Sequence, residues 1–288
     1  MVNDFEVAAG SIVGTDHLGD VQILLGKNNQ DAYVVRNSPS AIVAIICDGC
    51  GSGKHSELGA QLGAASLAHH LSNFSDDLLE DYLRTIVVHG TLNAARKDVL
   101  SELRVLAKSI GNSLSETVNE YLLFTVIGVM ITKNWTAIFS CGDGIFHLNG
   151  ETVELQPEAG NQPAYLGYNL TGSSLTDSNP SLLNFQVQRL LETKDVESII
   201  IASDGAGMFP KIKDRNVPGK QESAGDLDQF FADKYFANPD AIRRRLALLN
   251  TRRIRMNPEG DGIAVEHGLL KDDTTIVSIR RKQPAGDN

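Results

Sequence analysis

The chain has 288 residues, and its 36 acidic residues outnumber its 26 lysines and arginines by ten. Such an acidic balance repels nucleic acid and anionic lipid, so we expect neither nucleic acid nor a membrane as a partner. The longest apolar stretch is too short to span a bilayer, and no leader pattern follows the first residues. Three cysteines cannot all pair with one another, which indicates a reducing compartment. We therefore expect a soluble, cytoplasmic protein.

The N-terminal part of the chain is predicted to form strands, followed by two helices. Short apolar runs alternate with Gly, Asp and Asn over residues 5–36, which is typical of strands joined by turns. Residues 41–47, AIVAIIC, form a continuous apolar run, which indicates a strand buried on both faces.

Two helices are expected after this strand. Residues 55–71 have helical spacing, and Ser56 is the predicted N-cap. The expected buried face of this helix contains Leu58, Leu62, Ala65 and Leu71. A long helical stretch follows Ser75 and extends to residue 110, with an expected interruption near Gly90.

The middle of the chain contains further strand patterns. Residues 124–155 hold several apolar runs separated by short polar links, and short links require antiparallel pairing of consecutive strands. The pair Asn149-Gly150 suits a tight hairpin turn. Residues 156–184 are rich in Gly, Asn, Ser and Pro and are predicted to be loop. A further buried strand, IIIA, then ends just before Asp204.

The C-terminal part is predicted to contain one helix and one strand. Asn238 and Pro239 are expected to cap and open a helix that continues through residue 253. The last strand follows a pair of aspartates, and residues 282–288 are expected to form a disordered tail. No repeat or linker divides the chain, so we expect residues 1–281 to form one α+β domain of antiparallel sheets and helices.

Aspartates recur where these predicted strands begin or end. They are Asp31, Asp48, Asp204 and Asp272 at strand boundaries, and Asp143 in an expected hairpin turn. A single such aspartate is an ordinary turn or cap residue. If the strands lie side by side, however, their ends converge, and the carboxylates repel and raise each other's pKa. A divalent cation removes that repulsion, and an all-oxygen ligand set favours Mg²⁺ or Mn²⁺ over zinc.

Cys47 and Cys50 have the C-x-x-C spacing of redox and zinc sites. Zinc would need two further ligands, and the sequence contains no second C-x-x-C and no H-x-x-x-H. We therefore interpret these cysteines as structural.

Five motifs of the chain resemble, in order and at compatible spacing, those of a known family. NNQDAY resembles N-E-D-A, CDGCGSG resembles D-G-H-G-G, and SCGDGIFHL resembles a G-D-S-R hairpin. IIASDGAGMF resembles A-S-D-G-L-W-D, and KDDTTIVSI resembles D-N-x-T followed by a strand. On these motifs, nearly the whole chain resembles the metal-dependent PP2C-type (PPM) serine/threonine protein phosphatases. The first two motifs and their surroundings are most similar to the divergent bacterial branch of that family.

The resemblance implies an α-β-β-α sandwich of two antiparallel sheets, with a binuclear metal centre at one end. Asp48 would bridge two Mg²⁺ or Mn²⁺ ions and, with Asp204, would be central to catalysis. The other ligands implied by the resemblance are Asp31, the Gly49 carbonyl, Asp204 and Asp272, with Asp143 at a third, looser ion. Two such ions activate a bridging water and neutralise the phosphoryl oxygens. The implied reaction is hydrolysis of phosphoserine or phosphothreonine in proteins, with a signalling role in a bacterium.

The chain departs from the family pattern at three positions. Gln30 replaces a ligating Glu, and Gly26 replaces a phosphate-binding Arg, for which Lys27 or Lys54 could substitute. Cys50 replaces a His often credited as the general acid. The alternative candidates to protonate the leaving oxygen are His55 and His17.

Two basic stretches stand out in this acidic chain. The first follows Asp204 and contains Lys211, Lys213, Arg215 and Lys220, which we expect to guide a phosphorylated protein segment to the metals. The second is a set of arginines over residues 243–255, which we interpret as a solvated face.

Three functions remain open from the sequence. The first is an active Mg²⁺- or Mn²⁺-dependent protein serine/threonine phosphatase, monomeric, with a phosphoprotein as substrate and a Ser/Thr kinase as a further partner. The second is a catalytically impaired regulatory or phosphoprotein-binding module, in keeping with Gln30, Gly26 and Cys50. The third is a metal hydrolase acting on a small phosphate ester or nucleotide, although no nucleotide-binding loop occurs in the sequence.

Overall fold

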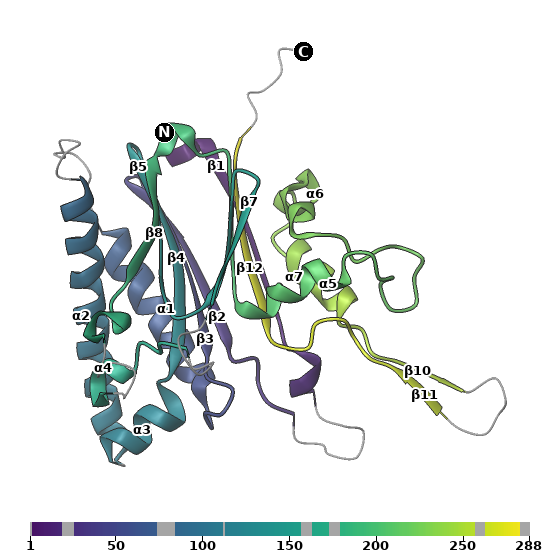
Figure 1. Ribbon diagram of the computed structural model, residues 1–288, viewed down its shortest axis with the longest axis horizontal. Coiled ribbons are helices and arrows are strands. Elements are labelled where there is room, and N and C mark those ends of the chain that lie inside the picture. The colour runs from purple at the N-terminus through teal and green to yellow at the C-terminus, as the bar shows by residue number, and fades with distance from the viewer. Residues whose placement is uncertain are drawn as a thin grey trace.

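The protein is a sandwich of two five-stranded antiparallel sheets with helices on both outer faces (Figure 1). The structure, a computed structural model, describes residues 2–18, 26–73, 84–111, 113–156, 163–172, 179–256 and 263–282. Parts of four predicted segments lie outside the described residues. They are residues 19–25 of the predicted N-terminal strand region, the start of the long helical stretch, much of the loop 156–184, and the tail beyond Lys282.

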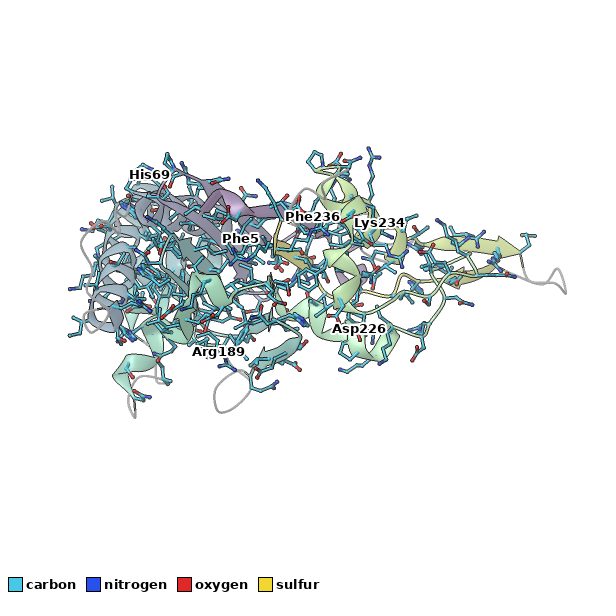
Figure 2. All side chains as sticks on the ribbon, turned by 90° about the horizontal axis from the view of Figure 1, so that it is seen from above. Phe5, His69, Arg189, Asp226, Lys234 and Phe236 are labelled. Carbon is cyan, nitrogen blue, oxygen red and sulfur yellow. The ribbon has the colours of Figure 1, made fainter. Side chains whose placement is uncertain are left out.

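The two sheets draw their strands from distant parts of the chain. The first sheet has the order β1 (Phe5–Ile12), β12 (Thr274–Arg281), β9 (Ser198–Ala202), β6 (Gly144–Leu148) and β7 (Glu151–Leu155). The second has the order β2 (Asp31–Asn37), β3 (Ala41–Gly49), β4 (Phe124–Thr132), β5 (Trp135–Cys141) and β8 (Gln186–Glu192). A separate hairpin, β10 (Arg253–Met256) and β11 (Ile263–Glu266), projects from the sandwich in both views (Figures 1 and 2).

The helices divide between the two outer faces. The second sheet is covered by α1 (Ser56–Ser72), α2 (Arg84–Ile110), α3 (Leu114–Tyr121) and the short α4 (Tyr168–Thr171). The first sheet is covered by α5 (Phe209–Ile212), α6 (Asp233–Phe236) and α7 (Ala241–Leu249). Short 3-10 turns are Val2–Asp4, Thr15–His17, Pro180–Leu183, Thr193–Asp195, Asp204–Met208 and Leu227–Phe231. The predicted α-β-β-α sandwich is therefore confirmed.

The continuous apolar run of β3 is explained by burial on both of its faces. Alternate side chains of a strand point to opposite faces of the sheet. Ala41, Val43 and Ile45 belong to the core between the sheet and its helices, while Ile42, Ala44 and Ile46 belong to the core between the two sheets. The strand therefore has no face that water can reach.

Helix α1 packs through small residues, and of the predicted face only Leu71 is buried. Leu58 and Leu62 are each 37% exposed, and Ala65 is also exposed. The buried face includes Gly59, Ala60, Gly63, Ala64, Leu67 and Leu71. A Cβ on Gly63 would lie 2.5 Å from the ring of Phe124, so the helix can approach β4 this closely only without a side chain there. The predicted cap was also wrong: Ser56 is already helical, and its hydroxyl donates to the Cys50 carbonyl at 2.9 Å.

Two further expectations were wrong: the interruption of the long helix near Gly90 and the hairpin turn at Asp143. Helix α2 runs through Gly90 without a break, because this glycine is exposed and its conformational cost of about 1 kcal/mol is small. Asp143 does not lie in a hairpin turn: β5 and β6 pair with different strands in different sheets. Gly142 and Gly144, with φ of 92° and 134°, let the chain cross from one sheet to the other.

The hairpin turn at Asn149-Gly150 is confirmed, with φ of 48° and 92° and antiparallel pairing of β6 with β7.

The C-terminal helix is shorter than predicted. Asn238 forms a turn in which its side chain accepts from the Asp240 amide at 2.9 Å, and α7 then runs only from Ala241 to Leu249. Strands β8, β10 and β11 were not predicted. In β8 and β10 the side chains are at most partly buried and show no continuous apolar run. Among the described residues, no helix is long and apolar enough to cross a bilayer.

Replacing Gly63 with Ala is expected to destabilise the fold by about 1–3 kcal/mol, because the added methyl group overlaps the Phe124 ring in a close-packed core. The matched control is Gly90→Ala, where nothing lies within 4 Å of the added atom and the helix gains up to about 1 kcal/mol. Urea unfolding measures both. Equal effects of the two substitutions would contradict the close approach of α1 to the sheet.

Candidate metal and active site

The aspartates predicted at strand boundaries converge at one end of the sandwich. The register of β2 and β3 places Asp31 directly opposite Asp48 in the second sheet. In the first sheet, Asp204 follows the last residue pair of β9 and β12, and Asp272 lies just before β12 begins. Both sheets therefore end in carboxylates on the same side of the molecule.

A cavity of 420 Å³ opens at this end. The predicted ligands Asp48, Gly49, Asp143, Asp204 and Asp272 line it, and so does His17. We call this cavity the acidic pocket. Asp31 does not line it but lies buried beneath, 6% exposed.

Two buried oxygens beneath the pocket lack partners. Ser203 donates its hydroxyl to Asp31 Oδ2 at 2.7 Å, but Asp31 Oδ1 accepts no hydrogen bond in the part of the chain that the structure describes. The same holds for Gln30 Oε1, whose amide nitrogen donates to the Ser56 hydroxyl at 2.6 Å. Buried acceptors normally have partners, so these two oxygens indicate a missing electropositive group.

The crowding of carboxyl groups changes their acidity. Burial, together with the charges of Asp273 and Asp204, raises the pKa of Asp31 to about 7. Burial and the neighbouring Asp31 and Asp204 raise the pKa of Asp48 well above its ordinary range. Burial and Asp272 raise the pKa of Asp204, and burial and Asp204 raise that of Asp143 to about 6. The pocket is thus arranged for a cation that the protein chain does not supply.

Glycines follow two of these aspartates because the backbone is crowded there. A Cβ on Gly49 would lie 2.8 Å from the Gln30 carbonyl oxygen and 2.9 Å from the Ser56 hydroxyl. A Cβ on Gly205 would lie 2.1 Å from the Asp273 carbonyl oxygen. The Asp-Gly pairs therefore let chain segments approach so closely that the carboxylates meet.

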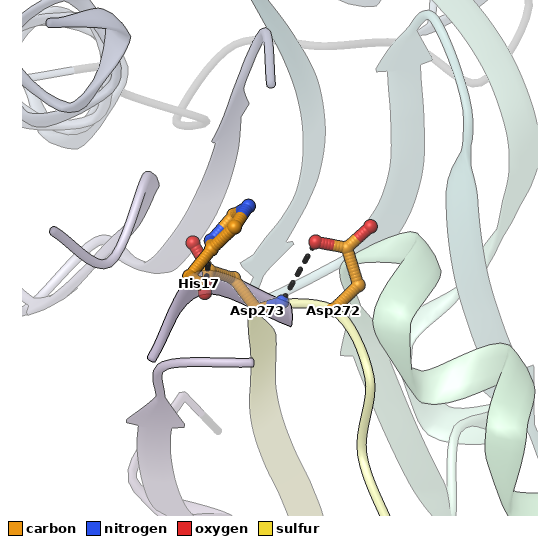
Figure 3. A group of neighbouring side chains, drawn as sticks. All are labelled: His17, Asp272 and Asp273. Carbon is orange, nitrogen blue, oxygen red and sulfur yellow. Dashed lines mark hydrogen bonds and ion pairs between the residues drawn. The ribbon is translucent and has the colours of Figure 1, made fainter. Parts of the chain in front are cut away.

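Asp273 is a clamp that holds the floor of the site together. Its Oδ1 accepts from the Gly14 amide at 2.7 Å and from His17 Nδ1 at 2.9 Å (Figure 3). Its Oδ2 accepts a hydrogen bond from the backbone amide of Gln30 at 2.5 Å. These bonds join the segment before β2 to the start of β12, and they fix the orientation of the imidazole.

His17, Asp272 and Asp273 present ligand atoms within 4.8 Å of one another, which is a spacing suited to a metal ion. Both oxygens of Asp273 already accept hydrogen bonds, and His17 Nδ1 is engaged with one of them. Asp272 is more exposed, and one of its oxygens accepts only the Asp273 amide at 2.9 Å (Figure 3). Of these three residues, Asp272 is therefore the carboxylate available to an ion.

The other predicted site residues lie farther out. His55 is exposed, stacks on Tyr121 with ring centroids 5.7 Å apart, and does not line the acidic pocket. Lys27 donates to the carbonyl of Gly51, a residue of the pocket wall, at 2.5 Å. Lys54 lines a neighbouring cavity of 580 Å³ that shares Pro163 and Tyr165 with the acidic pocket.

The predicted basic stretch lies in and after α5 and does not line the acidic pocket. It contains Lys211, Lys213, Arg215 and Lys220, all exposed. Lys213 faces Asp226 across 4.0 Å. The stretch follows Asp204 closely in the chain, but its side chains make no direct contribution to the pocket wall.

The sequence reasoning missed several residues of the site. Ser203 directly precedes the predicted ligand Asp204, and Asp273 directly follows the predicted ligand Asp272. The pair of adjacent aspartates at 272–273 could have indicated Asp273. Glu154 and Tyr165 line the pocket from β7 and from the segment before α4. No sequence motif around either residue indicates a role in the site, because only the tertiary fold brings them to this end of the sandwich.

The metal-free protein is expected to lose stability as the pH rises from about 4 to about 7. Asp31 has a folded-state pKa of about 7 against an ordinary 3.8, so across this window the folded state retains a proton that the unfolded chain releases. Asp31→Asn should flatten the decline. Urea midpoints measured in the presence of EDTA test this, and midpoints that rise with pH over the same window would contradict it.

Comparisons with known proteins agree with this architecture. A model of the family described as Protein phosphatase 2C matches residues 14–245. No curated protein matches the chain significantly. Solved structures with the same fold include a bacterial serine phosphatase variant, at 13% identity and a TM-score of 0.57 over 96% of this chain and 99% of that chain.

Two further structures show the same fold. The serine/threonine phosphatase Stp1 from Staphylococcus aureus aligns at 13% identity and a TM-score of 0.53, over 97% of this chain and 96% of that chain. The serine/threonine phosphatase PstP/Ppp from Mycobacterium tuberculosis aligns at 15% identity and a TM-score of 0.51, over 97% and 99%. The family match covers most of the chain, and the aspartates that line the acidic pocket lie at one end of the sandwich. The chain belongs to the protein phosphatase 2C family.

Proposed function

We propose that the protein is a Mg²⁺- or Mn²⁺-dependent phosphatase that hydrolyses phosphoserine and phosphothreonine in proteins, in bacterial signalling. The observation that carries this proposal is the buried carboxylate Asp31, one of whose oxygens has no hydrogen-bond partner among the described residues. It lies beneath a pocket lined by five further aspartates. Uncompensated carboxylates at this spacing repel each other, and hard divalent cations prefer oxygen ligands of this kind.

The proposed ligands are those that the family resemblance implies, and the lining of the pocket supports them. Asp48 is central, because it lies opposite Asp31 in the sheet and lines the pocket with Asp204 and Asp272. The carbonyl of Gly49 and the carboxylate of Asp31 would complete the proposed set, and Asp143, which also lines the pocket, would hold a third, looser ion. Bound there, two such ions lower the pKa of water and neutralise the oxygens of a phosphoryl group.

The chain's own residues contribute a proton and a positive charge. Asp273 accepts a hydrogen bond from His17 Nδ1, and His17 lines the pocket. In the imidazolium form both ring nitrogens carry hydrogen, so Nε2 can give its proton to the leaving oxygen and leave a neutral imidazole that stays bonded to Asp273. Lys27 lies at the pocket rim through its bond to the Gly51 carbonyl, where its charge can attract the phosphoryl group in place of the arginine absent at Gly26.

The wider partners remain part of the proposal. The substrate is a phosphorylated protein, and a Ser/Thr kinase supplies it. The basic stretch after Asp204 is exposed and can attract the acidic phosphoprotein without touching the reacting group. We propose that the protein acts as a monomer.

Hydrolysis of a phosphothreonine peptide tests the proposal. Wild-type protein should turn over with Mn²⁺ or Mg²⁺ and not with EDTA, and Asp204→Asn should reduce the rate by on the order of 100-fold or more, because it weakens the charge stabilisation of the reacting phosphoryl group. Folded protein that binds the peptide without turnover under any metal condition would instead support the regulatory module. Preference for nucleotides over phosphopeptides would support the small-ester hydrolase.

His17→Gln should reduce kcat on a phosphothreonine peptide by about 100-fold. The reduction should be much smaller on p-nitrophenyl phosphate, whose leaving group needs no proton. The matched control is His55→Gln, because His55 is exposed and outside the pocket wall. If both substitutions lower the peptide rate equally, or if the loss at His17 is the same on both substrates, His17 is not the proton donor.

A further inference from the structure

A second cavity, of 520 Å³, lies at the base of the β10–β11 hairpin. Three basic side chains line it, Arg252, His267 and Lys271, together with Asp16, Thr15 and Leu18. We call it the basic pocket. The hairpin that contributes to it projects from the sandwich in two perpendicular views (Figures 1 and 2).

The basic pocket and the acidic pocket share a wall. The Thr15 amide donates to the Leu270 carbonyl at 3.0 Å, and the Asp16 amide donates to the Lys271 carbonyl at 3.0 Å. These bonds hold two short segments together, and neighbouring residues on each segment face different cavities. Asp16 and Lys271 line the basic pocket, whereas the next residues, His17 and Asp272, line the acidic one.

Among the described residues, the basic side chains of the basic pocket outnumber its one acidic lining residue, Asp16. In the described part of the chain, Arg252, His267 and Lys271 form no ion pair, and the buried Nε of Arg252 has no hydrogen-bond partner. Nearby arginines differ: Arg255 pairs with Glu266 at 3.7 Å, and Arg243 pairs with Asp240 at 3.2 Å. In a chain with a net charge of −10, basic groups left without acidic partners indicate an external anion.

We propose that the basic pocket is a subsite for an anionic side chain that flanks the phosphorylated residue of the substrate. The proposal rests on the proposed function, with the scissile phosphoryl group in the acidic pocket. Arginine and lysine bind carboxylates and phosphoryl groups through charge-assisted hydrogen bonds, and a partly desolvated arginine binds them best. The subsite defines the substrate class as phosphosites with an acidic residue or a second phosphorylated residue nearby.

This preference is the opposite of what the overall charge predicts. An acidic chain with an acidic pocket should repel acidic peptides and favour basic ones. A basic pocket one wall away from the site gives acidic flanks a favourable position, and only at the distance that spans the two cavities. The dependence on position therefore distinguishes a subsite from general electrostatic attraction.

The test uses phosphothreonine peptides in which one glutamate is moved along an otherwise neutral sequence, with glutamine at the same position as reference. Binding is measured by fluorescence anisotropy with Mn²⁺, on peptides that carry a non-hydrolysable phosphonate analogue of phosphothreonine, and turnover is measured with Mn²⁺ on the phosphothreonine peptides. At one or two positions, glutamate should improve both Kd and KM by about tenfold over glutamine. A second arm replaces that glutamate with phosphoserine and shows whether a phosphoryl group or a carboxylate is preferred.

Arg252→Ser and Lys271→Ser should each remove most of this glutamate preference. Lys271 is exposed, so its replacement is compatible with folding even if Arg252→Ser is not. The control is Arg255→Ser, which removes one positive charge from the hairpin that starts next to Arg252 but lies outside the pocket lining, and it should retain the preference. An equal loss in all three variants, or no position at which glutamate helps, would overturn the proposal.

The two readouts separate this inference from the proposed function. Absence of turnover on every peptide would contradict the proposed activity, while the anisotropy series would still decide whether an anion subsite exists. Turnover of all peptides without any glutamate preference would uphold the activity and overturn the subsite.

Discussion

The structure depends on bringing carboxylates together at one end of a β-sandwich, where burial and mutual repulsion disfavour their charges. Asp31 and Asp48 are paired across adjacent strands, and Asp204 and Asp272 reach the same place from the other sheet. Burial and the neighbouring carboxylates raise the pKa of Asp31, Asp48 and Asp204, which is the consequence of this crowding. A fold selected only for stability would pair these acids with arginine or lysine, whereas here the acidic pocket is left open to a cation from outside.

The backbone around the pocket is held rigidly so that this arrangement persists. Asp273 joins three segments through bonds to Gly14, His17 and Gln30, and Gly205 permits the close passage of the chain beside it. The hydrogen bonds of Asp273 hold the pocket floor together and also orient the imidazole of His17. The proposed proton transfer therefore depends on the same hydrogen bonds as the structure of the pocket. The proposed anion subsite is attached to this network by the hydrogen bonds between residues 15–16 and 270–271.

Sequence patterns predicted the buried strands and the acidic end because both have local causes, whereas the partly exposed β8 and β10 were not predicted. The apolar run of residues 41–47 indicates a strand that is buried on both faces. An Asp followed by Gly indicates a strand that ends in a carboxylate at a place where another backbone segment comes close. The face of α1 could not be predicted, because its Gly59 and Gly63 derive their role from Phe124 in a distant strand. Likewise, a turn between β5 and β6 looks the same in the sequence whether the chain pairs back or crosses to the other sheet.

The departures at Gln30, Gly26 and Cys50 leave the carboxylates in place, so the central claim concerns where a metal ion binds. Anomalous diffraction from crystals soaked in Mn²⁺ tests it most directly. We predict peaks in the acidic pocket, in contact with Asp48, Asp204 and Asp272, and adjacent to the unpartnered oxygen of Asp31. A peak confined to the His17, Asp272 and Asp273 group, or the absence of any peak at millimolar Mn²⁺, would contradict it.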